Sequence, residues 1–196
     1  MNKIYISLGC ALLLNLQLSG CISASALPDE QRPRTWAHVV SKPHNFYQVS
    51  EHVYRSEQPS GDVLALLRQQ NIQMVINLRA SNLDAQVLQS IAHIQMVHIP
   101  INTWSISREE LLQVMQSIEK AKQQNKNVLI HCYHGSDRTG ASVAMYRIIF
   151  ENWSREDALN EMKHGGYGFH PIWFNIEKLF SPENIKWIRN QLSNPS

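Results

Sequence analysis

The chain has 196 residues, with 18 Lys and Arg against 16 Asp and Glu, and 43% of its residues are hydrophobic. A charge this close to neutral argues against a nucleic-acid-binding surface, which needs a clear excess of basic side chains. After the N-terminal segments described next, about 150 residues remain, enough for one domain with a sizeable core.

Residues 1–20 have the pattern of a lipoprotein-type signal peptide. Lys3 supplies a positive start, and the apolar stretch 4–18 is too short and too interrupted for a membrane span. The four residues that end at Cys21, Leu-Ser-Gly-Cys, resemble a bacterial lipobox, which implies cleavage before Cys21 and its acylation. The alternative is an ordinary secretory signal cut nearby. Because Ile22 rather than Asp follows, we expect an exported protein anchored in the outer membrane, with its domain periplasmic or external.

The segment from residue 21 to 44 is rich in Ser, Pro and charged residues and shows no sustained hydrophobic period. It is expected to be a tether between the lipid and the domain. The apolar residues 36–40 within it are able to dock on the domain.

From residue 45 to 196 the chain alternates between strand-like and helix-like segments, which we assign to one domain. The expected strands cover residues 46–49, 52–55, 73–78, 95–100 and 128–131. The expected helices cover residues 63–70, 83–92, 141–150 and 172–191, and two more begin at Ser107-x-x-Glu110 and Ser154-x-x-Asp157. This alternation predicts an α/β fold: a three-layer sandwich with a central, mostly parallel sheet flanked by helices.

The domain contains a single cysteine. Cys10 lies inside the signal peptide and Cys21 is the expected lipid-bearing residue, which leaves Cys132 alone. In an oxidising compartment a second thiol would be able to form a disulfide with a reactive cysteine. The pattern fits a protected catalytic thiol, although chance also leaves single cysteines.

Residues 131–140, His-Cys-Tyr-His-Gly-Ser-Asp-Arg-Thr-Gly, lie between an apolar strand-like run and a helix-like segment. In such a strand–loop–helix unit, the loop amides and the helix N-terminus point at one small volume that suits an anion. Arg138 adds a planar guanidinium that can hold two phosphate oxygens. The same field favours a thiolate at Cys132. The pattern predicts attack of this thiolate on a phosphate ester.

This string resembles the signature loop of the cysteine-dependent protein tyrosine and dual-specificity phosphatases. Residues 54–59, 75–79 and 165–171 are similar to segments of small bacterial enzymes of the dual-specificity type. The resemblance implies a dual-specificity phosphatase-like fold and hydrolysis of phosphotyrosine, phosphoserine, phosphothreonine or small phosphoesters. Cys132 would form a cysteinyl-phosphate and Arg138 would bind the phosphoryl group, with no metal or organic cofactor.

The other loop residues receive supporting roles. Thr139 is expected to assist departure of the thiolate, or to act as an N-cap-type residue of the following helix. His131 orders the loop or is a core histidine, and Gly140 permits close approach of the backbone. A metal site at this loop lacks a second ligand cluster. The expected substrate-binding residues are Tyr133, His134, Gly135, Ser136 and Arg138.

The general acid is missing from its expected place. Phosphatases of this type carry an aspartate on a loop before the nucleophile strand, but residues 99–107 contain no carboxylate. Asp137, next to Arg138, is the replacement candidate, an arrangement that resembles the myotubularin-type lipid phosphatases. The alternative for Asp137 is a structural carboxylate that pairs with a cation or caps backbone N–H groups.

Several residues outside the loop have two interpretations each. Arg55, Arg79 and His170 line the mouth of the site or make structural bonds, and Trp104 walls the pocket or belongs to the core. The carboxylates of Asp84, Glu109 and Glu110 are expected to be solvated helix residues.

Two other functions compete with the phosphatase. The missing upstream aspartate would suit a catalytically weak phosphate- or phosphopeptide-binding module. Sulfur or redox chemistry also uses cysteine loops, but it normally needs further thiols. The absence of lysine from the loop favours a phosphorylated protein or small phosphoester over a lipid substrate. The oligomeric state stays open.

Overall fold

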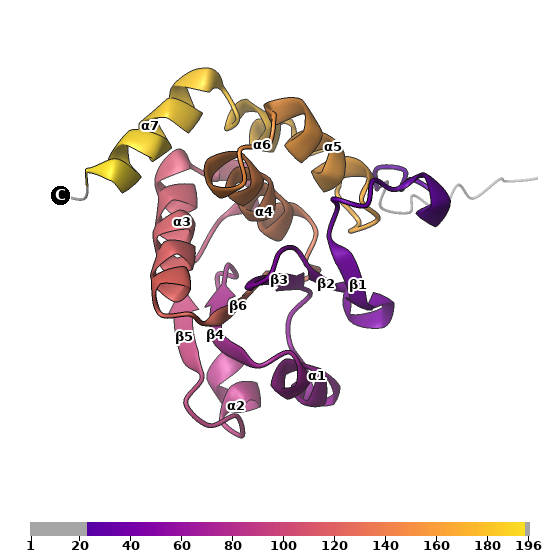
Figure 1. Ribbon diagram of the computed structural model, residues 1–196, viewed down its shortest axis with the longest axis vertical. Coiled ribbons are helices and arrows are strands. Elements are labelled where there is room, and N and C mark those ends of the chain that lie inside the picture. Colours follow the sequence, from indigo (N-terminus) through magenta and orange to yellow (C-terminus); the bar gives the residue numbers. More distant parts are fainter. Residues whose placement is uncertain (1–22, 195–196) are drawn as a thin grey trace, which may run out of the picture.

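The computed structural model describes residues 23–194, so the expected signal peptide and Cys21 lie outside the described residues. Six strands form one sheet in the order β1-β2-β3-β6-β4-β5 (Figure 1). The strands are β1 (His38–Ser41), β2 (Phe46–Gln48), β3 (Val53–Ser56), β4 (Ile72–Asn77), β5 (Gln95–His98) and β6 (Asn127–His131). The first three are antiparallel neighbours, whereas β3, β6, β4 and β5 run parallel, which confirms the predicted mostly parallel sheet.

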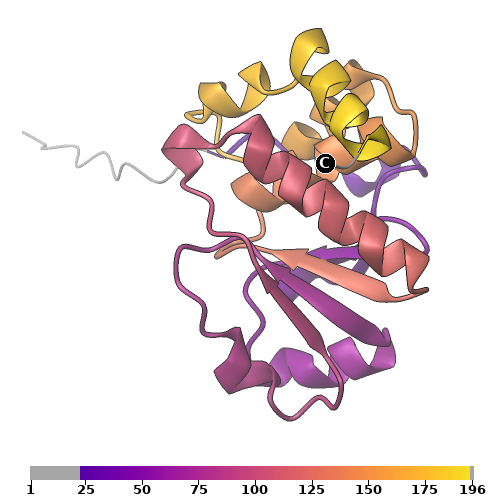
Figure 2. The ribbon, with the colours of Figure 1, turned by 90° about the vertical axis from the view of Figure 1, so that its left-hand side faces the viewer.

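Helices cover both faces of the sheet and complete the predicted three layers (Figures 1 and 2). On one face lie α1 (Leu64–Gln69) and α2 (Asp84–Leu88). On the other lie α3 (Arg108–Gln123), α4 (Asp137–Phe150), α5 (Arg155–His164), α6 (Phe174–Lys178) and α7 (Pro182–Ser193). Short 3-10 helices occupy Asp29–Gln31, Lys42–His44, Gly61–Val63 and Thr103–Ser105 (η4). Among residues 23–194, no helix has the length and apolar character needed to span a membrane.

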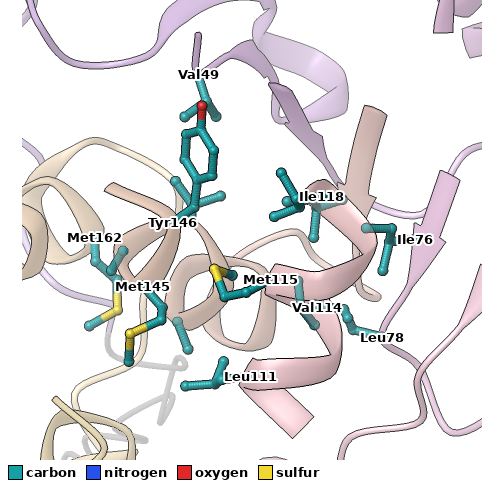
Figure 3. Close-up of a cluster of buried hydrophobic side chains, with 14 of the residues drawn as sticks. Val49, Ile76, Leu78, Leu111, Val114, Met115, Ile118, Met145, Tyr146 and Met162 are labelled. Carbon is teal, nitrogen blue, oxygen red and sulfur yellow. The ribbon is translucent and has the colours of Figure 1, made fainter. Parts of the chain in front are cut away.

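The core forms because successive strand residues point to opposite faces. Met74 and Ile76 of β4 belong to the larger cluster under α3 and α4, while Val75 between them belongs to the cluster under α1 and α2. Helix α3 begins with the predicted capping box of Ser107 and Glu110. Its face of Leu111, Val114, Met115 and Ile118 packs toward the sheet (Figure 3).

Two predicted boundaries are wrong. Residues 38–44 of the expected tether belong to the domain, because β1 pairs with β2, and the preceding Trp36 and Ala37 are buried. The expected helix 172–191 is two helices, since Pro182 starts α7 at a position where its missing N–H costs nothing. Ser181 caps this new helix by accepting the N–H of Asn184.

Candidate active site

Residues 132–138, the connection after β6 together with the first two residues of α4, form a loop in the middle of the sheet. In sheets of this kind, ligands bind beyond the carboxyl ends of the parallel strands. Cys132 directly follows β6 and is only 3% exposed, which places it at the base of the loop. Arg138 lies in the first turn of α4, and its Nη1 donates to the carbonyl oxygens of Leu78 at 3.3 Å and Ile101 at 3.4 Å. These bonds hold the guanidinium beside the loop.

The loop backbone is arranged to receive an anion. Three consecutive carbonyl oxygens accept hydrogen bonds from outside the loop: Tyr133 from the N–H of Gln58 (3.1 Å), His134 from Asn45 (2.8 Å) and Gly135 from Arg55 (2.6 Å). The N–H groups of residues 133–136 make no hydrogen bond within the described part of the chain. Because each peptide N–H points opposite to its carbonyl, these donors are left for a bound oxyanion, together with the N-terminus of α4.

Arg55 is the main support under this loop. It is fully buried, donates through Nη2 to Gly135, and lies with its Cζ 3.7 Å from the centre of the Tyr167 ring. Its Nε and Nη1 have no partner within residues 23–194, and burial lowers the pKa of its guanidinium. Gly135 has φ +71°, and a Cβ there would lie 2.4 Å from the carbonyl oxygen of Ser56. Only glycine fits this close approach.

A buried pair, absent from the sequence-based prediction, fixes His131, the residue before Cys132. Nε2 of His131 lies 2.8 Å from Oδ2 of Asp84, and Nδ1 of the same ring lies 3.1 Å from the carbonyl oxygen of Cys132. The expectation that Asp84 is solvated is therefore wrong, since it is 3% exposed and His131 is fully buried. The two are 47 residues apart in sequence, and no local pattern links them.

Asp137 is the first residue of α4 and contacts His170 of the loop after α5. Its Oδ1 accepts the backbone N–H of His170 at 2.9 Å, and its Oδ2 lies 2.9 Å from Nδ1 of the same residue. This is the arrangement that the structural interpretation of Asp137 predicts, with a paired and backbone-bonded carboxylate. The pair lies at the rim of the loop and is partly exposed.

The remaining loop side chains divide into buried and exposed groups. Thr139 is fully buried inside the first turn of α4, and its Oγ1 has no partner among the described residues. The N-cap position belongs to Ser136 instead, so the capping alternative for Thr139 is wrong. A Cβ on Gly140 would lie 3.0 Å from Cγ of Met162, as expected for a glycine at a close approach.

Aromatic side chains stand around the mouth of the loop. Tyr133 is 54% exposed, and its ring centre lies 5.0 Å from Cζ of Arg79 and 4.6 Å from the ring centre of His134. On another side, Trp104 of η4 is 63% exposed and stacks edge-on against Trp173 at 4.4 Å. Trp104 is thus not part of the core, and its role as a wall of the pocket stays a prediction.

A hollow of about 450 Å³ opens beside the loop, between it and the segment that precedes α6. Its lining includes His134, Ser136, Tyr167 and His170. Within residues 23–194, no three His, Cys, Asp or Glu side chains gather as a metal site would require.

Comparison with known proteins agrees with this geometry. The family model of the dual specificity phosphatase catalytic domain matches residues 53–173. The dual specificity protein phosphatase TpbA of Pseudomonas aeruginosa is 32% identical over 151 residues, which cover 77% of this chain and 67% of that protein. The crystal structure of P. aeruginosa TpbA matches with a TM-score of 0.74 and 29% identity, over 83% of this chain and 99% of that one.

Other solved structures extend the comparison. A cysteine-to-serine variant of P. aeruginosa TpbA in complex with phosphotyrosine matches equally well, with a TM-score of 0.74 and 29% identity over 83% and 99% of the two chains. The catalytic core of the PP-IP phosphatase SIW14 from S. cerevisiae has a TM-score of 0.64 at 20% identity, over 79% and 96% of the chains, and shows the fold alone. The present chain belongs to the dual-specificity phosphatase family of cysteine-dependent phosphatases, and it hydrolyses phosphate monoesters.

Proposed function

We propose that this enzyme is an exported, lipid-anchored phosphatase that acts on phosphotyrosine, phosphoserine or phosphothreonine of proteins, or on small phosphoesters. The observation that carries the proposal is the loop of residues 132–138, with its outward-bonded carbonyls, its free N–H groups and a lone cysteine at its base. The exposed rings of Tyr133 and Trp104 favour an aryl phosphate, because they can wall a flat ring that carries the phosphoryl group.

The reaction runs in two steps. The Cys132 thiolate attacks phosphorus, the bond to the leaving oxygen breaks, and a cysteinyl-phosphate forms. The guanidinium of Arg138 and the loop N–H groups stabilise the charge on the three equatorial oxygens. Water then attacks phosphorus, and the thiolate departs with a hydrogen bond from the otherwise unpaired hydroxyl of Thr139.

The leaving oxygen needs a proton, which we assign to Asp137 acting as a pair with His170. The pair lies at the rim next to Arg138, and the loop of residues 99–107 offers no carboxylate of its own. The backbone N–H of His170 donates to Oδ1 of Asp137 at 2.9 Å, and Nδ1 of His170 lies 2.9 Å from Oδ2, so carboxylate and imidazole are placed to share one proton. In this proposal Asp137 of the signature loop donates the proton that an aspartate on the upstream loop donates in other phosphatases of this type.

The first experiment measures phosphate release from p-nitrophenyl phosphate by residues 22–196, which contain every helix and strand of the domain. Wild-type turnover that Cys132→Ser abolishes, together with acid-quenched labelling of the protein by a 32P-phosphotyrosine peptide, is the expected result. Absence of turnover by the folded, reduced protein from pH 5 to 8 would contradict the proposal and favour a phosphate-binding module.

The proton donor is tested by comparing leaving groups. Asp137→Asn should slow hydrolysis of phenyl phosphate by about 100-fold, the lower range for general acid catalysis, but p-nitrophenyl phosphate far less, since its better leaving group needs little protonation. His170→Gln should show the same selectivity. Equal losses on both substrates would assign Asp137 a structural role only.

Anchorage at Cys21 is tested in cells that express the full chain. Wild-type protein should fractionate with membranes and incorporate labelled palmitate, and Cys21→Ser should do neither. Release of the wild type into the soluble fraction would contradict the anchor and leave the phosphatase proposal untouched.

A further inference from the structure

Exposed apolar side chains gather around the mouth of the active site. Seven large hydrophobic side chains are strongly exposed within residues 23–194, and four of them form what we term the aromatic rim: Trp104 (63%), Tyr133 (54%), Ile172 (58%) and Phe174 (63%). The other three are Val39 on β1, Leu83 before α2 and Met96 on β5, which belong to separate elements. Four of the seven thus belong to three segments that adjoin the active-site loop, whereas single exposed apolar side chains elsewhere are normal for a protein surface.

The segments that carry the rim are linked to the active-site loop. Trp104 follows Ile101, whose carbonyl oxygen accepts from Arg138. Trp104 also stacks on Trp173, which separates Ile172 from Phe174 in the sequence. The remaining member, Tyr133, lies within the signature loop. The rim residues therefore come from the signature loop itself and from segments linked to it.

The N-terminal segment reaches the domain on this face as well. The N–H of Ala24 donates to the carbonyl oxygen of Phe169 at 2.7 Å, and the N–H of Leu27 donates to that of His164 at 2.9 Å. Ser23 lines the hollow that also contains His134. Cys21 is three residues before Ala24, and a fully extended chain spans at most about 11 Å over that distance. An acyl chain on Cys21 would thus be held close to the active-site opening.

We propose that the aromatic rim is a membrane-docking surface, which places the active-site mouth against a phospholipid bilayer. The orientation rests on the proposed anchor at Cys21, whereas the rim is an independent observation. Trp and Tyr prefer the membrane interface, and Phe and Ile gain from leaving water. Lys178, with Nζ 5.3 Å from the Phe174 ring centre and no carboxylate partner among the described residues, adds a charge that suits anionic headgroups.

Docking in this way has a consequence for substrate choice. The mouth faces the bilayer, so phosphate groups held at the bilayer surface reach Cys132 more readily than those on proteins far from it. The short span to Cys21 allows little freedom for the domain to turn its mouth away.

The test is co-sedimentation of residues 22–196 with vesicles of phosphatidylethanolamine and phosphatidylglycerol. The rim variant Ile172→Ser/Phe174→Ser removes two side chains that have no role in the chemistry, and Val39→Ser/Met96→Ser is the matched control. We expect the rim variant to bind the vesicles at least about tenfold more weakly than wild type, because it buries less apolar area in the bilayer. The control variant should bind like wild type. Brominated lipids should quench wild-type fluorescence more than that of Trp104→Phe.

Thermal unfolding and p-nitrophenyl phosphate turnover are measured on the same samples, so that a failed phosphatase proposal is distinguishable from failed docking. Equal vesicle binding by the rim and control variants would overturn the proposal, and so would absence of binding by wild type. A wild-type dimer that the rim variant converts to monomer, without vesicle binding, would make the rim a self-association surface and also overturn it.

Discussion

Substitution of Asp84 by Ala removes the acceptor that His131 uses inside the protein. Asp84 is 3% exposed and His131 is fully buried, so water cannot replace the lost carboxylate without a structural change. Breaking a buried ion pair by deleting one partner costs about 3–5 kcal/mol, and leaving a neutral donor unsatisfied costs about 1–3 kcal/mol. We expect Asp84→Ala to lower the free energy of unfolding by about 3 kcal/mol, between these ranges. Asp84→Asn keeps an oxygen at the same place and should cost about 1 kcal/mol.

The same substitution should reduce activity without any contact with substrate. His131 precedes Cys132, the proposed nucleophile, and its second ring nitrogen lies 3.1 Å from the carbonyl oxygen of Cys132. A displacement of reacting groups by about 1 Å can cost about 100-fold in rate, so we expect kcat of Asp84→Ala to fall 10- to 100-fold. Alkylation of Cys132 by iodoacetate should slow in parallel, because that rate reports on the thiolate itself.

Urea unfolding and steady-state hydrolysis of p-nitrophenyl phosphate measure the two effects. Asp62→Ala is the matched control, since its side chain is 68% exposed and such surface changes alter the free energy of unfolding by less than about 0.5 kcal/mol. If Asp84→Ala has the unfolding midpoint and kcat of wild type, the buried pair neither stabilises the fold nor positions the loop. If Asp84→Asn loses as much as Asp84→Ala, the charge matters more than the hydrogen bond.

Three further substitutions test other parts of the structure. Gly135→Ala should abolish measurable phosphate release, because its Cβ would meet the Ser56 carbonyl oxygen at 2.4 Å; activity within tenfold of wild type would contradict this geometry. Glu161→Ala leaves the buried guanidinium of Arg147 without its bidentate partner and should lower the free energy of unfolding by about 3–5 kcal/mol, as urea titration would reveal. Burial raises the pKa of Tyr146 to about 12, so the folded phenol retains its proton when the unfolded one loses it. Stability should therefore fall between pH 10 and 12, and less steeply in Tyr146→Phe.

The central part of the fold was predictable from sequence because its signals are local. The buried parallel strands β4 and β6 are apolar runs, and α3 carries both its capping box and its apolar face. The edge strand β1 was not predicted, since its residues are half exposed and its identity as a strand depends on pairing with β2. The break before α7 had a local signal, Ser181-Pro182, which the aromatic pattern of residues 172–191 obscured.

The site residues also divide into those that local sequence predicts and those that depend on tertiary packing. The placement of Cys132 and Arg138 in the site was predictable from the ten residues 131–140, because a single strand–loop–helix unit forms the anion-binding loop. The partners of that unit come from distant segments: Asp84 lies before it and His170 after it, and each bond depends on how α2 and the loop after α5 pack. A single sequence without tertiary packing contains no pattern that joins these residues.

Arg55 shows why this loop is shaped for an anion and not for stability. A fully buried guanidinium with two nitrogens that find no partner among residues 23–194 is costly, and a neutral side chain that packed against Tyr167 would cost less free energy. The charge on Arg55 becomes favourable when negative charge lies nearby: burial lowers the pKa of this arginine, and Tyr167, Glu161 and Cys132 oppose that effect. The loop of residues 132–138 therefore lies among three sources of positive potential: Arg55, Arg138 and the N-terminus of α4. The anions of the reaction bring negative charge that offsets the free-energy cost of burying the Arg55 guanidinium.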